Sequence, residues 1–130
     1  MGNGSRKLSR QCRGRRKKLS EVLLYALEQG PTEATILKQC ERMGREIPAA
    51  IQNKPWLMPG LELFYVAFRD LHTCRGGMGD GPIPWTAIEQ YCDALVVEGD
   101  QRRRLHLNVR AMDNTFLEHH RKQADAKRKG

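Results

Sequence analysis

The sequence predicts an all-α fold, a small bundle of four to five helices with disordered basic termini. Apolar residues recur at helical spacing in three separate stretches. No stretch alternates apolar and polar residues as a half-buried strand does. Positive charge is concentrated at the two ends, where few apolar residues are available for a core. At 130 residues, the chain has room for one domain with a modest core.

The net charge of +8 is distributed unevenly. Residues 1–19 contain eight Lys or Arg and no acid, and residues 121–130 contain five against one acid. The remaining 10 basic and 14 acidic residues give residues 20–120 a net charge of −4. We therefore predict a disordered basic arm (1–19), two short helices (20–44), a helical core module (45–120) and a basic tail (121–130).

The two short helices have recognisable ends. Ser20 can cap the first helix, and Gly30-Pro31 stops it. Thr32 can cap the second helix, and Gly44 ends it. The pair resembles a helix-turn-helix in outline, but the mixed charge of the second helix does not supply a row of base-reading side chains.

Three prolines make residues 45–60 an extended strap, with room for one helical turn at 48–53. Trp56 and Leu57 lie in this strap. They either dock on the core or form an exposed anchor for a partner, and the sequence leaves both interpretations open.

The core module contains three further helices. The first spans about 60–74, the second starts at Pro84 with Trp85 in its first turn, and the last is capped by Asp100. The predicted core comprises Phe64, Phe68, Leu71, Ile88, Tyr91, Val109, Met112 and Phe116. Leu95 continues the stripe of the middle helix.

The core module also contains a glycine-rich loop and a run of three arginines. The glycine loop at 76–84 has no Gly-Lys-Ser/Thr and no preceding strand, which excludes a phosphate-binding loop. The run 102–104 should be solvated, but three arginines are unfavourable at the positive end of a helix. That conflict predicts an acidic contact elsewhere, in the chain or in a partner.

We expect no catalytic, cofactor-binding or metal-binding residues. The four cysteines show no Cys-x-x-Cys spacing, and they are expected to be free thiols. His72 and Cys74 are two residues apart, so a helix would point them away from each other. No apolar run is long enough to cross a bilayer, and we expect a cytoplasmic protein without a membrane partner.

Three blocks in the C-terminal two thirds carry a family resemblance. Residues 59–75, 81–91 and 109–118 resemble, in that order, small tail assembly chaperones from the tail gene cluster of long-tailed bacteriophages. The resemblance covers about residues 55–120 and does not include the basic arm.

The resemblance implies that the protein holds the tape measure protein, tail tube subunits or both during tail assembly, and it supplies no catalytic residues. An apolar groove receiving an amphipathic helix is the binding mode we expect. Trp56, Leu57 and Trp85 are the candidate partner contacts, although both tryptophans could instead be core residues. The alternative function is nucleic-acid binding or regulation through the basic arm. The oligomeric state is left open.

Overall fold

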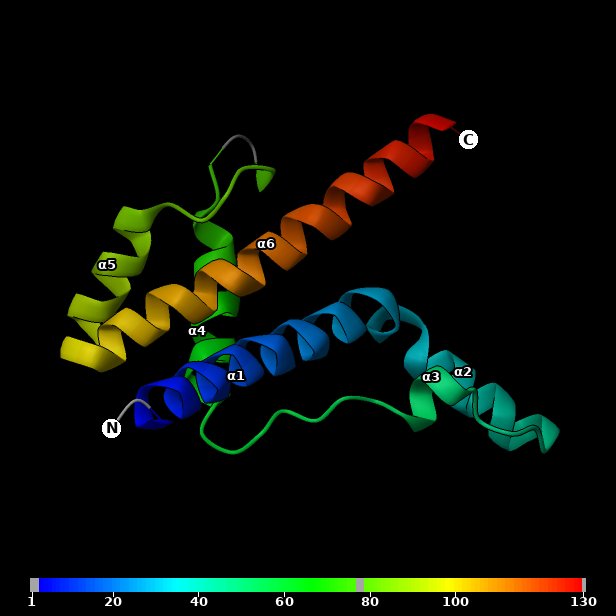
Figure 1. Ribbon diagram of the computed structural model, residues 1–130. Coiled ribbons are helices and arrows are strands. Elements are labelled where there is room, and N and C mark those ends of the chain that lie inside the picture. Colours follow the sequence, from blue (N-terminus) through cyan, green and yellow to red (C-terminus); the bar gives the residue numbers. More distant parts are fainter. Residues whose placement is uncertain (1–2, 77–78, 130) are drawn as a thin grey trace.

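The computed structural model describes residues 3–76 and 79–129, and for residues 3–13 and 15 it describes the backbone alone. All regular structure in these ranges is helical, which confirms the predicted all-α class. The elements are α1 (Asn3–Glu28), α2 (Gly30–Met43), α3 (Ala49–Gln52), α4 (Glu62–Leu71), the 3-10 turn η1 (His72–Cys74), α5 (Trp85–Ala94) and α6 (Gly99–Lys129) (Figure 1).

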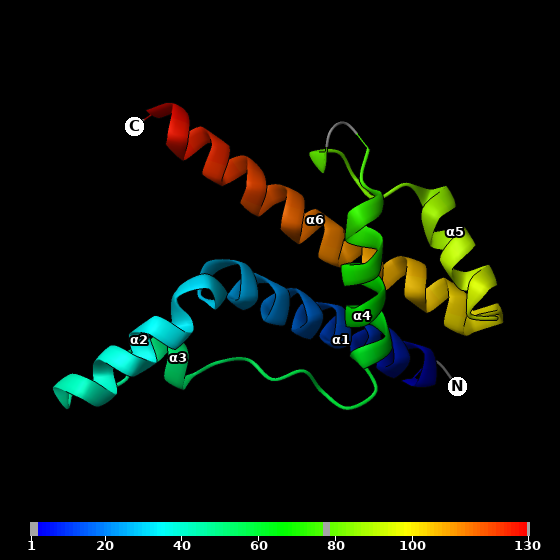
Figure 2. The same cartoon turned by 180° about the vertical axis from the view of Figure 1, so that it is seen from behind.

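The long helices α1 and α6 form the frame of the molecule. They lie side by side, run in the same direction and diverge toward their C-terminal ends (Figures 1 and 2). Helix α4 crosses this pair, and α5 lies beside the start of α6. Helices α2 and α3 lie together beyond the end of α1, and the strap from α3 leads back to α4.

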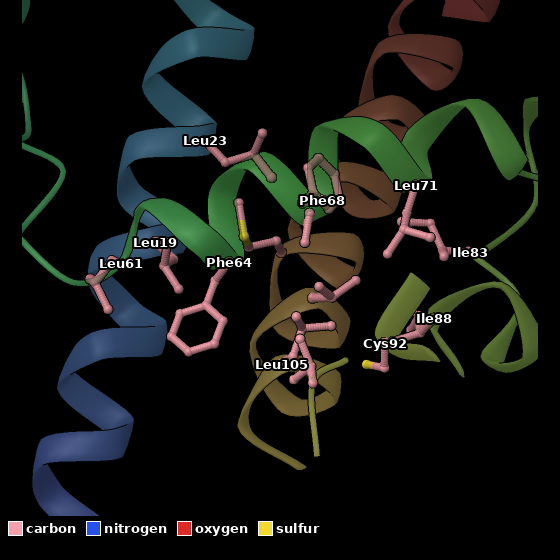
Figure 3. Close-up of a cluster of buried hydrophobic side chains, with 14 residues drawn as sticks. Leu19, Leu23, Leu61, Phe64, Phe68, Leu71, Ile83, Ile88, Cys92 and Leu105 are labelled. Atoms are coloured by element: carbon pink, nitrogen blue, oxygen red, sulfur yellow. The ribbon is translucent and has the colours of Figure 1, made fainter. Parts of the chain in front are cut away.

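One cluster of buried side chains joins α1, α4, α5 and α6 (Figure 3). Six of the eight predicted core residues are buried, and Tyr91 and Phe116 are partly buried against the cluster. The prediction for Leu95 is wrong, because α5 ends at Ala94 and Leu95 is 51% exposed. The cluster also contains Leu19, Leu23 and Ile83.

The predicted start of the first helix at Ser20 is wrong. Helix α1 begins at Asn3, and Ser20 lies inside it. Leu19, assigned to the arm, is fully buried, and Leu23 one turn later is 5% exposed. The physical reason is that these two leucines lie on one helix face, which packs against the core, and that Arg, Lys and Gln before them are good helix formers.

The other helix ends agree with the sequence to different degrees. Gly44 ends α2 in the left-handed conformation, as predicted. Thr32 does not cap α2, since the helix begins at Gly30 with Pro31 in its first turn. A helical turn forms within the predicted range 48–53. Helix α6 continues to Lys129, because no glycine or proline interrupts it, and residues 121–129 are exposed.

Leu19→Ala should destabilise the protein by about 2–5 kcal/mol, the usual cost of truncating a fully buried leucine. Leu24→Ala, the same change at a 37% exposed position of α1, is the matched control and should cost much less. Urea denaturation followed by circular dichroism measures both. Equal stabilities of the two leucine variants would contradict the assignment of Leu19 to the core.

Deletion of residues 2–13 should leave a folded protein.

Candidate partner-binding surface

A buried ion pair holds the loop after α4 against α6. The Asp113 carboxylate lies 2.5 Å from Nη1 of Arg75, and both side chains are 1% exposed. The second carboxylate oxygen accepts the backbone N–H of Ile83 at 3.1 Å. Arg75 Nε donates to His72 Nδ1 at 2.8 Å, and its Nη1 donates to the carbonyl of Gly81 at 3.1 Å. These bonds neutralise the charge of Arg75 and fix both ends of the glycine loop.

Phe116 of α6 connects this ion pair to the surface. The Arg75 guanidinium lies 4.1 Å from the centroid of its ring, and the His72 ring meets it edge-on at 4.7 Å between centroids. Partial burial lowers the pKa of His72, and the positive charge of Arg75 lowers it further. Since His72 accepts a hydrogen bond from Arg75, its Nδ1 is unprotonated in this arrangement.

The acidic contact predicted for the arginine run lies within the chain. Arg102 forms ion pairs with Glu89 and Asp93 of α5, so the expectation that it is solvated is wrong. His106 Nε2 lies 2.6 Å from the Glu89 carboxylate. The hydrogen bond from Arg102 is the main cause of the lowered pKa of the Glu89 carboxyl. Burial opposes this effect by raising the pKa, and the contact with His106 lowers it again. The carboxylates of α5 therefore supply the acidic contact that the arginine run at the start of α6 requires.

The three predicted contact residues occupy separate places. Trp56 is 82% exposed in the strap, and Trp85 is 60% exposed at the start of α5, where its ring lies 5.7 Å from that of His106. Neither tryptophan is a core residue. Leu57 is partly buried and packs against the core cluster. The strap and α5 lie on different sides of the α1–α6 pair, so the two tryptophans do not form one site (Figures 1 and 2).

The turn between α5 and α6 exposes two further aliphatic side chains. Leu95 is 51% and Val96 76% exposed. Val96 has a φ of 54°, a conformation that β-branched residues rarely adopt. The N–H groups of Val96 and Val97 donate to the carbonyls of Asp93 and Cys92, the pattern of a helix end that normally has glycine at this position. The sequence shows no glycine there and gave no sign of this helix end.

A groove runs between α1, α4 and α6, and we call it the three-helix groove. Its lining residues are Leu23, Ala26, Leu27, Tyr65, Phe68, Arg69, His72 and Phe116. The sequence predicts an apolar groove as the binding mode, but it does not predict that the first helix forms one of its walls, because that depends on which distant helices pack together. The spacing of Leu19, Leu23 and Leu27 was the available signal for this wall.

The described residues contain neither a metal-ligand cluster nor a membrane-spanning helix. No group of three or more His, Cys, Asp or Glu in these ranges could hold a metal ion. No helix there has the length and apolar character of a membrane span. Cys92 is buried, and this burial raises the pKa of its thiol, while Cys74 is exposed.

Comparison with known protein families identifies the family of this chain. A sequence model of the phage tail assembly chaperone family matches residues 40–118, well over half of the chain. The chain belongs to this family. No curated protein and no solved structure matches it.

The family segment of this tail assembly chaperone begins inside α2 and ends inside α6. It contains Trp56, Leu57, Trp85, the buried ion pair and two walls of the three-helix groove. Helix α1 lies outside the matched segment, yet it completes both the core and the groove. The surface therefore combines family residues with a helix that the family model does not cover.

Asp113→Asn should destabilise the chaperone by about 3–5 kcal/mol, because it leaves the Arg75 charge buried without a counterion. Asp125→Asn on the exposed part of α6 is the control and should be neutral. The double variant Arg75→Met, Asp113→Leu should recover much of the loss. Chemical denaturation measures all three, and a stable Asp113→Asn protein would show that the pair does not hold the fold.

Val96→Gly should stabilise the protein by about 1 kcal/mol, since glycine adopts a positive φ without steric cost. Val66→Gly, at a 50% exposed position inside α4, should instead destabilise it by about 1 kcal/mol. Thermal melts of the two variants test the opposite signs. A lower melting temperature for Val96→Gly would mean that the valine side chain stabilises the turn.

Proposed function

We propose that this tail assembly chaperone holds a helical segment of the tape measure protein during tail assembly in the host cytoplasm, and that it also receives tail tube subunits. Membership of the family carries the proposal at the level of tail assembly. The tape measure protein and the tail tube subunits are the clients that the resemblance over about residues 55–120 implies, and the exposed apolar surface of this chain supports a binding role.

Exposed aromatic and aliphatic side chains support a binding function. Trp56 and Trp85 are large apolar side chains that the core does not use. Aromatic anchors of this kind commonly supply much of the binding energy at protein interfaces. Leu57 lies next to Trp56 and packs against the core. This contact already restricts the strap, so the strap would lose less conformational entropy when a client binds.

The buried and half-buried charges of the described residues have structural roles. The buried cation Arg75 contacts Asp113 and Gly81 through its Nη1 and His72 through its Nε. Arg102 is engaged with two carboxylates of α5. The polar clusters of the described residues therefore hold the helices together, and we assign them to the fold.

Trp85→Ala should leave the protein folded and weaken client binding by about 2 kcal/mol, roughly 30-fold. The readout is co-expression with a phage tape measure protein, followed by measurement of soluble complex and of affinity for the purified segment. Trp56→Ala should have an effect of the same direction. Leu107→Ala, at a 46% exposed site on α6, is the control for loss of an exposed apolar side chain.

The proposal is wrong if the wild-type protein neither binds nor solubilises any tail protein encoded in its gene cluster. Nucleic-acid binding through the basic residues before Leu19 would then be the function to test, by the steep salt dependence that phosphate contacts produce. Full binding by both tryptophan variants would instead move the contact away from these residues.

A further inference from the structure

The three-helix groove is apolar along its walls. Leu23 and Leu27 come from α1, Tyr65 and Phe68 from α4, and Phe116 from α6. Phe68 is only 3% exposed and lies at the bottom of the groove, whereas Leu27, Tyr65 and Phe116 are partly buried and retain surface for a further contact. A helix with an apolar stripe could cover the exposed parts of these side chains, and burial of apolar surface would favour its binding.

The groove is preformed, because each wall is anchored in the core. Leu19 and Leu23 hold α1 against the other helices (Figure 3). Phe68 and Leu71 hold α4 in the same cluster. Phe116 lies against the guanidinium of Arg75, which is itself fixed to α6 by Asp113. A client would therefore meet a fixed surface and avoid much of the ordering cost of binding.

The groove presents one positive charge. Arg69 is the only charged residue among the lining residues when His72 is neutral. Arg69 is exposed, and it makes no ion pair or hydrogen bond within residues 3–76 and 79–129. The neighbouring carboxylate of Asp70 accepts a hydrogen bond from the Tyr91 hydroxyl at 3.0 Å. A carboxylate on the client would therefore complement Arg69.

We propose that the three-helix groove is the seat of an acidic amphipathic client helix, with the apolar stripe of that helix against Leu27, Tyr65 and Phe116 and a carboxylate beside Arg69. This inference rests on the proposed function and assigns the client segment its chemistry. It adds α1, which lies outside the family segment, to the binding surface.

Two fluorescein-labelled helical peptides of 18 residues test the charge. Both carry leucines along one face, and they differ only in having Glu or Lys beside that face. Fluorescence anisotropy with the full chain at low salt should show the Glu peptide binding about three- to fivefold tighter, the range of an exposed ion pair. Arg69→Glu should reverse this preference. Arg103→Glu, an exposed position of α6 that does not line the groove, should preserve it.

Ala26→Phe tests the groove itself. The new ring fills the space between α1 and α4, so both peptides should bind at least about tenfold more weakly, a loss of about 1.4 kcal/mol. Ala34→Phe on the exposed face of α2 is the matched control and should bind within twofold of the wild type. Circular dichroism confirms that each variant is folded.

Three results would overturn the assignment of the groove. The first is binding of neither peptide by the wild type, and the second is unchanged binding by Ala26→Phe. The third is a wild-type dimer in sedimentation equilibrium that Ala26→Phe converts to a monomer, because the occupant would then be a second copy.

Co-expression separates the two proposals. A tail protein held equally by wild type and Ala26→Phe removes the groove alone, while peptide binding without any bound tail protein removes the proposed function alone.

Discussion

The structure depends on covering one short apolar segment of α6. This helix has 31 residues, and its buried side chains all lie between Leu105 and Asp113. Helices α1, α4 and α5, which are far apart in the sequence, meet around that segment. The other described side chains of α6 are partly buried or exposed, so the fully buried core is confined to one part of the helix. The divergence of α1 and α6 beyond this contact leaves room for the three-helix groove.

The ion pair of Arg75 and Asp113 gives this packing its register. A buried pair of charges rarely adds much stability, since desolvation offsets the attraction, but its separation is costly. Here the pair also binds Ile83 and Gly81, so the loop between α4 and α5 can close in one position on α6. Phe116 packs on the same guanidinium and lines the groove. A polar contact in the core thus positions part of the candidate binding surface.

The apolar surface of this tail assembly chaperone consists of separate elements. Trp56 lies in the strap, Trp85 at the start of α5, and Val96 in a turn with an unfavourable backbone conformation. Each of these side chains is exposed and takes no part in the buried core. A client long enough to contact several of these places would gain affinity from contacts that are individually modest.

The sequence alone determined the helical class, most of the core and the family, because helical spacing and local turn residues such as Gly44 are local signals. It also indicated that the arginines near the positive end of the last helix need an acidic contact, but only the tertiary structure placed Glu89 and Asp93 beside Arg102. The same holds for Leu19, whose surroundings in the sequence are basic and whose burial depends on α4 and α6. The groove and the exposure of the two tryptophans were likewise decided by the tertiary structure, because each depends on which distant helices pack against one another.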